Sequence, residues 1–273
     1  MVVSTWAWPS GSDPLRVGEN PLQTNMLDMK HTFFAPPEAI SGDTIVLPDD
    51  EARHAVRVLR TRTGDEAAVV DGAGMWYRIA VEVVGRKNLV GRILERRPEH
   101  GEPAFHLTIA ICPLKNMARF EVFAEKATEL GLSRITPVIT KRSERSRLKA
   151  SRLRGILTAS MKQCGRSRLV RVDEPVKLKR FLKSADGSDS DFKGICHESA
   201  PPDRSLAAIL RARGLPARAT VLVGPEGGFT DEEIEMAGSH GFEILSLGER
   251  RLRAETAAIT VSAAFMLESS IAR

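Results

Sequence analysis

The chain has 273 residues, of which 42% are hydrophobic and 27% are charged, a composition typical of a soluble globular protein that can bury the cores of two domains. No apolar stretch approaches the roughly 18 residues that a membrane-spanning helix needs, so we expect no membrane contact. The three cysteines, Cys112, Cys164 and Cys196, are far apart and form no CxxC pair. We therefore expect reduced thiols in a cytoplasmic protein, with neither a disulfide framework nor a metal site.

The positive charge is concentrated in one segment. The net charge is +5, yet Lys141 to Arg171 holds eleven Lys and Arg residues against the single Glu144. A basic patch on an otherwise acidic chain favours a polyanion partner, because phosphate contacts dominate the affinity of proteins for nucleic acids. The alternative is a solvated helix face, which is the usual place of a run of charges.

The first third of the chain divides into two parts. Residues 1–29 lack periodicity and a secretory pattern, and we expect an extension without regular structure. Residues 30–97 show short β-like runs separated by turn signals, with helical spacing only around 51–59, which predicts a small β-barrel. Residues 96–103 are charged and contain Pro and Gly, and we interpret them as a linker.

From His106 onward, strands and helices alternate. The pattern predicts strands at 106–112, 135–139, 195–197 and 220–223, and helices at 120–130, 151–163 and 255–267. Gly131 is placed to end the first of these helices. Such alternation is typical of a parallel sheet with helices on both faces, so we predict an α/β domain over residues 104–273.

Two glycine segments near the C-terminus, 222–230 and 247–257, carry the strongest functional signal. Each follows an apolar run and precedes a helix, and the spacing of Thr230 and Glu233 predicts a capping box. Two such loops side by side would form a ligand pocket lined by backbone groups, unless they only close tight turns. The sequence lacks phosphate-loop and dinucleotide patterns, and Glu226 disfavours a pyrophosphate. A cationic or uncharged cofactor fits better.

These motifs resemble one family. Gly-Pro-Glu-Gly-Gly at 224–228 and Leu-Gly-x-x-x-Leu-Arg-x-Glu-Thr-Ala at 247–257, with upstream motifs in the same order from His54 on, resemble the RsmE family of ribosomal RNA methyltransferases in the SPOUT class. The resemblance implies a PUA-like RNA-binding β-barrel over 30–97, then a SPOUT α/β domain with a C-terminal trefoil knot, and a homodimer. It also implies transfer of a methyl group from S-adenosylmethionine to N3 of a uridine in 16S ribosomal RNA of the small ribosomal subunit. The alternatives are another SPOUT methylation, for example of a ribose 2′-oxygen, and a non-catalytic RNA-binding assembly factor.

The resemblance also suggests which residues act. A uracil N3 must lose its proton, and a guanidinium would stabilise the resulting negative charge; the alternative for each Arg is a phosphate contact or a surface salt bridge. The candidate catalytic residues are Arg253, Arg119, Arg142 and Glu255. The candidate cofactor contacts are His197, Val223, Gly224, Pro225, Glu226, Gly228, Leu247, Gly248, Leu252, Arg253, Thr256 and Ala257. The candidate RNA contacts are His54, Arg57, Arg60, Arg142, Arg145, Arg147, Arg166 and Arg168. Lys162 stands where many members of the family carry Glu, and we expect it to alter an RNA or subunit contact.

Overall fold

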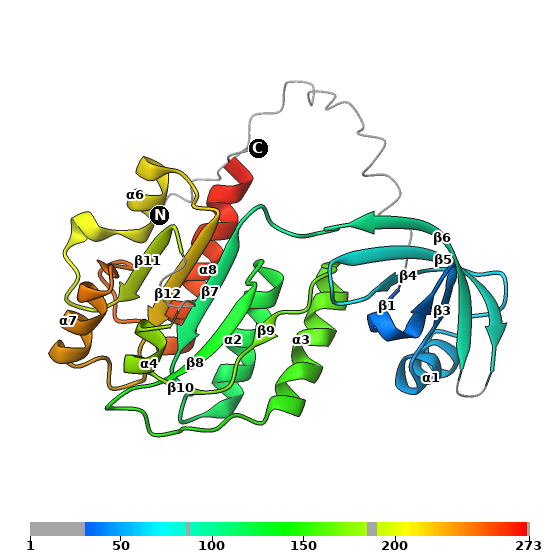
Figure 1. Ribbon diagram of the computed structural model, residues 1–273, viewed down its shortest axis with the longest axis horizontal. Helices are drawn as coiled ribbons and strands as arrows, with labels where there is room; N and C mark the ends of the chain where they lie inside the picture. Colours follow the sequence, from blue (N-terminus) through cyan, green and yellow to red (C-terminus); the bar gives the residue numbers. More distant parts are fainter. Residues whose placement is uncertain (1–30, 86–87, 185–189, 272–273) are drawn as a thin grey trace, which may run out of the picture.

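A computed structural model describes residues 31–85, 88–184 and 190–271 of the chain, so the predicted N-terminal extension at 1–29 lies outside the described residues. The described chain forms two domains that lie side by side (Figure 1). We call residues 31–98 the barrel domain and residues 104–271 the parallel-sheet domain. No helix among the described residues is both long and apolar enough to cross a membrane.

The barrel domain contains one mixed sheet that curves into a half-barrel. Its elements are β1 (Thr32–Phe34), a 3-10 turn (Pro37–Ala39), β2 (Ile40–Ser41), β3 (Thr44–Val46), α1 (Asp49–Arg57), β4 (Glu66–Val70), β5 (Met75–Val84) and β6 (Leu89–Pro98). The strand order is β1-β4-β5-β6-β3-β2, and only the β1–β4 pair is parallel. The alternating side chains of these strands bury Phe33, Ile45, Val69 and Ile79 inside the curve. The predicted β-rich first domain is thereby confirmed.

The parallel-sheet domain alternates strands and helices as the sequence pattern predicts. Its strands are β7 (His106–Ile111), β8 (Arg134–Ile139), β9 (Arg171–Val172), β10 (Val176–Lys177), β11 (Phe192–Cys196), β12 (Arg218–Val223) and β13 (Glu243–Leu245). Its helices are α2 (Met117–Glu129), α3 (Ala150–Cys164), α4 (Leu178–Leu182), α6 (Leu206–Arg213), α7 (Asp231–Ser239) and α8 (Ala254–Ile271), with a 3-10 turn at Pro202–Arg204. The strand order is β10-β8-β7-β12-β11-β13, with β9 paired to the start of β8, and every pair is parallel.

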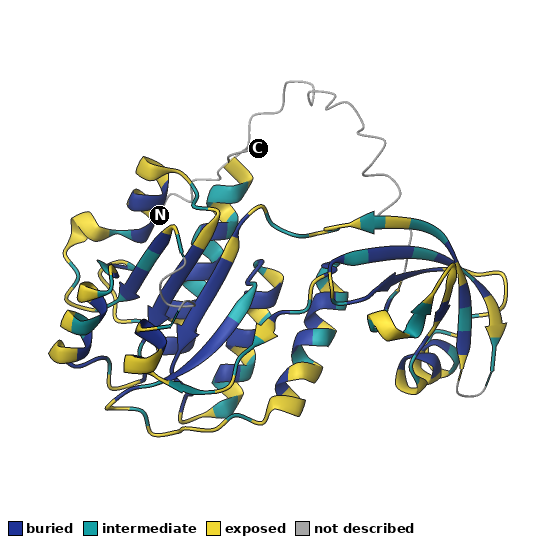
Figure 2. Ribbon diagram, viewed as in Figure 1, coloured by how far each residue is buried: buried dark blue, intermediate teal, exposed yellow. Residues whose placement is uncertain are grey.

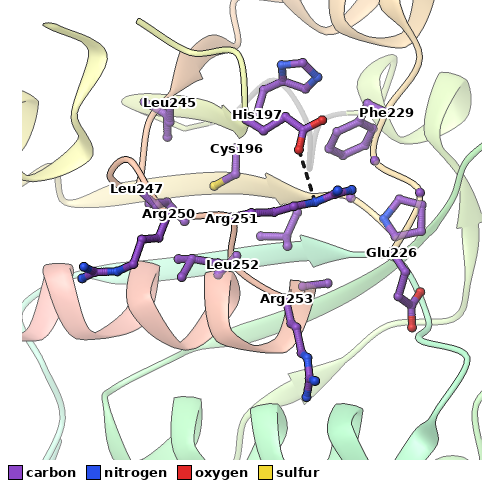
Figure 3. A pocket seen from close by; sticks show the side chains of 18 of the residues that line it. Cys196, His197, Glu226, Phe229, Leu245, Leu247, Arg250, Arg251, Leu252 and Arg253 are labelled. Carbon is purple, nitrogen blue, oxygen red and sulfur yellow. Dashed lines mark ion pairs between the residues drawn. The ribbon is translucent and has the colours of Figure 1, made fainter. Parts of the chain in front are cut away.

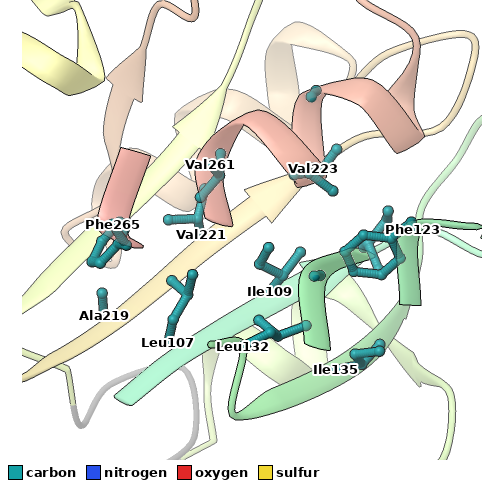
Figure 4. Close-up of a cluster of buried hydrophobic side chains, with 14 of the residues drawn as sticks. Leu107, Ile109, Phe123, Leu132, Ile135, Ala219, Val221, Val223, Val261 and Phe265 are labelled. Atoms are coloured by element: carbon teal, nitrogen blue, oxygen red, sulfur yellow. The ribbon is translucent and has the colours of Figure 1, made fainter. Parts of the chain in front are cut away.

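Helices cover both faces of this sheet, which confirms the predicted architecture. On one face, Ile109 and Val221 pack against side chains of α2 and α8, including Phe123 and Phe265 (Figure 4). On the other face, neighbouring strand residues such as Leu222 pack against α4 and α7. The central strands are therefore buried on both sides, as Figure 2 shows, and their sequences are continuous apolar runs.

The two domains are joined by a buried junction. Met161 on α3 packs against Trp76, Val70 and Ala68 of the barrel domain. Beside this cluster, Lys162 forms an ion pair with Glu51 on α1. The sequence suggested that Lys162 contacts RNA or a second subunit, whereas its ammonium group is engaged by the barrel domain. The orientation of the barrel relative to the parallel sheet is consequently fixed by both apolar packing and charge.

Candidate active site

A cavity of about 380 Å³ opens at the carboxyl ends of β11, β12 and β13. In open α/β sheets this edge is the usual place for a ligand, because the loops that follow neighbouring strands meet there. The walls are the two predicted glycine segments and the residues that follow β11 (Figure 3). The volume lies within the range of small-molecule sites. The predicted meeting of the two glycine loops around one pocket is confirmed.

The first glycine loop, residues 224–230, is a tight turn that ends in a helix cap. Gly228 has φ +70°, and its amide donates to the carbonyl of Pro225 at 2.8 Å. Thr230 then begins α7 with the predicted capping box, in which its hydroxyl accepts from the Glu233 amide and the Glu233 carboxylate accepts from the Thr230 amide. Because φ is positive at Gly228, a side chain there would strain the turn.

The second glycine loop, residues 247–253, joins β13 to α8. Gly248 has φ +110°, and its amide donates to the hydroxyl of Ser246 at 3.2 Å. Leu247 and Leu252 place apolar side chains against the pocket, and Ala257 on the first turns of α8 completes that wall. The pocket therefore combines apolar side chains with exposed backbone groups, which suits a flat aromatic base attached to a polar body.

Nearly all of the predicted cofactor contacts line this pocket. They are His197, Val223, Gly224, Pro225, Glu226, Gly228, Leu247, Gly248, Leu252, Arg253 and Ala257. Thr256 does not line it, because its place on α8 turns the side chain to solvent. Glu226 lies at the wall, but its carboxylate accepts a hydrogen bond from the Lys115 amide at 3.1 Å. Glu226 thus braces the loop that follows β7.

Sequence reasoning missed several residues of the wall. They are Cys196, Glu198, Gly227, Phe229, Leu245, Arg250, Arg251 and Ala254. Most are direct neighbours of motif residues, so adjacency was the signal that could have found them. Burial raises the pKa of Cys196 to about 12, and its thiol is consequently protonated near neutral pH. A thiol in this state is a poor nucleophile, which argues against a covalent step at Cys196.

Three of the four candidate catalytic side chains lie at the start of α8, and the fourth, Arg142, lines the pocket from the loop after β8. Arg253 is exposed at the pocket and forms no ion pair with any described residue. Arg119 on α2 lies 3.6 Å from the largely buried carboxylate of Glu255, measured from Nε to Oε1. An acidic residue in the first turn of a helix is stabilised by the helix dipole, so Glu255 is held in place by two effects. Arg253 is therefore available to a substrate, as is Arg250, which also lines the pocket and forms no ion pair with any described residue.

The candidate RNA contacts separate into exposed and buried residues. His54, Arg57 and Arg60 of the barrel domain are exposed, as are Arg145 and Arg147. Arg168 is half-exposed and forms an ion pair with Glu99 of the linker.

Arg166 differs from this group, because its guanidinium is only 4% exposed and pairs with Glu102 at 2.7 Å. It also donates to the carbonyls of Thr128 and Leu132. Its burial corrects the expectation that Arg166 contacts RNA.

Much of the basic run is neutralised within the molecule. Six of its members pair with carboxylates: Lys141–Glu232, Arg152–Glu121, Lys162–Glu51, Arg166–Glu102, Arg168–Glu99 and Arg171–Asp173. Arg147, Lys149 and Arg154 form no ion pair with any other described residue and are exposed. The surface available to a polyanion is therefore smaller than the sequence suggested. Within the described residues, no group of three or more His, Cys, Asp or Glu side chains is arranged to hold a metal ion.

The comparisons with known proteins agree with this geometry. An RNA methyltransferase domain family matches residues 101–266, and an RNA methyltransferase PUA domain family matches residues 47–94. Ribosomal RNA small subunit methyltransferase E of Synechocystis sp. is 32% identical over 84% of this chain and 75% of its own length.

Two solved structures are also similar. A ribosomal RNA small subunit methyltransferase E from Neisseria gonorrhoeae, bound to S-adenosylmethionine, superposes with a TM-score of 0.76 at 27% identity, over 87% of this chain and 97% of that one. The methyltransferase Lpg2936 of Legionella pneumophila, also with bound S-adenosylmethionine, gives 0.74 at 30% identity, over 87% of this chain and 97% of that one.

Proposed function

The chain belongs to the ribosomal RNA small subunit methyltransferase E family, and from this premise we propose that it methylates N3 of a uridine in 16S ribosomal RNA of the small ribosomal subunit. It is an S-adenosylmethionine-dependent RNA methyltransferase with a PUA domain. The observation that carries the proposal is the pocket formed by two glycine loops, with Arg250 and Arg253 at its edge and in no ion pair with any described residue. The target nucleotide and the atom that is methylated are the parts that need an experiment.

The pocket suits S-adenosylmethionine. Val223, Leu247, Leu252 and Ala257 provide an apolar wall for the adenine, and the glycine loops present backbone donors and acceptors to the polar groups. No lysine is placed for a phosphate at the first loop. When bound, the cofactor supplies an electrophilic methyl group on a sulfonium. The loops hold the ligand, and their apolar walls exclude water from it.

We assign to Arg253 the role of stabilising the uracil that is methylated. Loss of the N3 proton leaves negative charge on the flanking uracil oxygens, and a guanidinium fixed beside the pocket stabilises that charge. Figure 3 shows Arg253 leaving the loop just before α8, on the same side as Glu226 and away from Cys196. Glu255, two residues further along the chain, pairs with Arg119 on α2, so a second guanidinium is oriented nearby. Positioning of the base by these groups supplies much of the acceleration.

We also infer the remaining features that the resemblance implies. A homodimer is supported by the exposed Leu267 and Ile271 at the end of α8, which form an apolar strip one helical turn apart. A C-terminal trefoil knot is inferred from membership of the family, and the segment concerned is the one in which α8 follows the edge strand β13. A ribosomal substrate would place the enzyme in the cytoplasm.

Methyl transfer from labelled S-adenosylmethionine to ribosomal particles tests the proposal. The acceptors are small subunits, large subunits and naked 16S ribosomal RNA, all from cells that lack this enzyme. We expect label in the small-subunit RNA and none in the large subunit. Label confined to large-subunit RNA would contradict the substrate, and cofactor binding without any transfer would favour a non-catalytic assembly factor.

A further inference from the structure

Arg142 reaches from the loop after β8 to the first glycine loop after β12. Its Nη1 donates to the carbonyl of Gly227 at 2.7 Å and to the carbonyl of Phe229 at 3.2 Å. Both carbonyls belong to residues that line the proposed cofactor pocket, and the side chain of Arg142 lines the same pocket. Hydrogen bonds from a charged donor are stronger than those between neutral groups, so this contact restrains the turn on which Gly228 lies.

A second contact joins the same two loops. Glu233 accepts from the Lys141 amide at 2.8 Å through Oε1 and from the Thr230 amide at 3.0 Å through Oε2. Glu233 is a buried residue, at 8% exposure, and its carboxylate is the same group that caps α7. The glycine loop is therefore bonded to the β8 loop at its middle by Arg142 and at its end by Glu233. Few alternative shapes remain open to a segment held at both points.

The β8 loop is itself a closed turn, which makes it a firm support. Ser143 accepts from the Thr140 amide at 2.9 Å, and its hydroxyl lies 3.0 Å from that of Thr140. Arg142 packs closely under the glycine loop, since a β-carbon at Gly227 would lie 3.5 Å from its side chain. The guanidinium is thus fixed by backbone groups and not by a carboxylate.

We propose that Arg142 is a positioning residue that holds the first glycine loop in its cofactor-binding shape. This inference rests on the proposed function, because the ligand of the loop is taken to be S-adenosylmethionine. It replaces the expectation that Arg142 is a catalytic or RNA-contacting guanidinium. Arg142 acts on the cofactor through the carbonyls of Gly227 and Phe229.

Binding measurements separate this role from the others. Arg142→Ala should raise the Kd for S-adenosylhomocysteine, measured by calorimetry, by about tenfold or more. The reason is that one charged donor to two carbonyls is lost. Arg142→Lys should recover part of the loss, because one donor remains. At saturating cofactor, kcat and the Kd for small subunits should stay within about threefold of wild type. Arg152→Ala is the matched control, because it removes the same charge from α3 outside the pocket.

Amide hydrogen exchange tests the loop without any ligand. In Arg142→Ala, the Gly228 and Thr230 amides should exchange faster, while amides of α3 should be unchanged. Unchanged exchange in the loop would overturn the proposal, as would full cofactor affinity combined with lost RNA binding or lost kcat. If the wild-type protein itself does not bind S-adenosylhomocysteine, the proposed function fails, and the exchange experiment still decides whether Arg142 holds the loop.

Discussion

Lys162 on α3 and Glu51 on α1 form an ion pair that crosses from one domain to the other. The side chains are 21% and 9% exposed, and the second oxygen of Glu51 accepts from the Phe34 amide at 3.3 Å. The pair lies beside the apolar cluster of Met161 and Trp76. Together these contacts set the position of the barrel domain relative to the pocket between the two glycine loops.

Removing one member of this pair should destabilise the protein. Lys162→Met leaves the Glu51 carboxylate buried and uncompensated, and we expect the free energy of unfolding to fall by about 3 kcal/mol. Glu51→Gln in the same chain should restore part of that loss, since no charge is then left unpaired. Urea denaturation of the two single variants and the double variant measures the coupling. Additive effects would show that the two side chains do not interact in solution.

Arg166 and Arg168 lie close in sequence, but their substitutions should lower stability by very different amounts. Arg166→Ala leaves the buried Glu102 without its partner, and the free energy of unfolding should fall by about 3 to 5 kcal/mol. Arg168→Ala removes a half-exposed partner of Glu99 and should cost about 1 kcal/mol or less. Denaturant titration of both variants checks the difference. Equal losses would mean that Arg166 is not held as the structure shows.

The sequence predicts the architecture of this protein better than it predicts which charged side chains pair with one another. Alternation in the barrel, the strand–helix rhythm of the second domain and the Thr230–Glu233 capping box are local patterns, and all three are confirmed. Most of the ion pairs of the basic run are not local. Lys162 and Glu51 are 111 residues apart, and nothing in the basic run indicates that distant carboxylates neutralise half of it.

In the site too, local patterns could be predicted from the sequence and contacts between distant residues could not. Motif spacing located both walls of the pocket, because the glycines are needed where the backbone turns with positive φ. The contact of Arg142 with carbonyls 85 and 87 residues later has no signature in the sequence. Thr256 was assigned with its motif, but the helical periodicity of α8 turns it to solvent while Ala257 faces the pocket. A motif indicates which segment forms a site, and the geometry of the element decides which side chains enter it.

The two positive-φ glycines of the pocket should not tolerate alanine. Gly228→Ala and Gly248→Ala place a side chain in the left-handed region at φ +70° and +110°, which should cost at least about 1 to 2 kcal/mol each and weaken cofactor binding. Gly155→Ala is the control, because it lies in open space on α3 and should stabilise the helix by about 0.5 to 1 kcal/mol. Thermal unfolding and calorimetry measure both effects. Full cofactor affinity in both pocket variants would contradict the role of these turns.

Stability should fall as the pH drops through the range in which histidine titrates. Burial, and to a smaller extent Arg97, lowers the pKa of His100 below its ordinary value of 6.5. The folded state then binds fewer protons than the unfolded state. The contribution of His100 to the free energy of unfolding is therefore complete above the pKa that His100 has in the unfolded chain. It is lost as the pH falls toward the lower pKa that His100 has in the folded protein.

Denaturation of wild type between about pH 7.5 and about pH 5.5 should show this loss, and His100→Gln should show less of it. The lowered pKa values of Glu95 and Glu99 act at more acidic pH and do not overlap with this window. An identical pH dependence in wild type and variant would contradict the assignment.

Arg253→Ala should separate catalysis from cofactor binding. At saturating cofactor and substrate, kcat should fall by about a hundredfold or more, because the charge that develops on the uracil loses its fixed cation. The Kd for S-adenosylhomocysteine should change by less than about threefold, and Arg253→Lys should recover some activity. Arg211→Ala on α6, which removes an exposed arginine that does not line the pocket, serves as the control. An unchanged kcat would contradict the catalytic role and indicate that Arg253 only contacts a phosphate.

The identity of the methylated nucleoside tests the central claim most directly. Small ribosomal subunits lacking the modification are incubated with the enzyme and S-adenosylmethionine, and their RNA is digested and analysed by mass spectrometry against synthetic standards. We predict N3-methyluridine, formed by the wild-type protein and strongly reduced with Arg253→Ala. A 2′-O-methylated nucleoside or a different methylated base would retain the fold and the cofactor but contradict the proposed reaction.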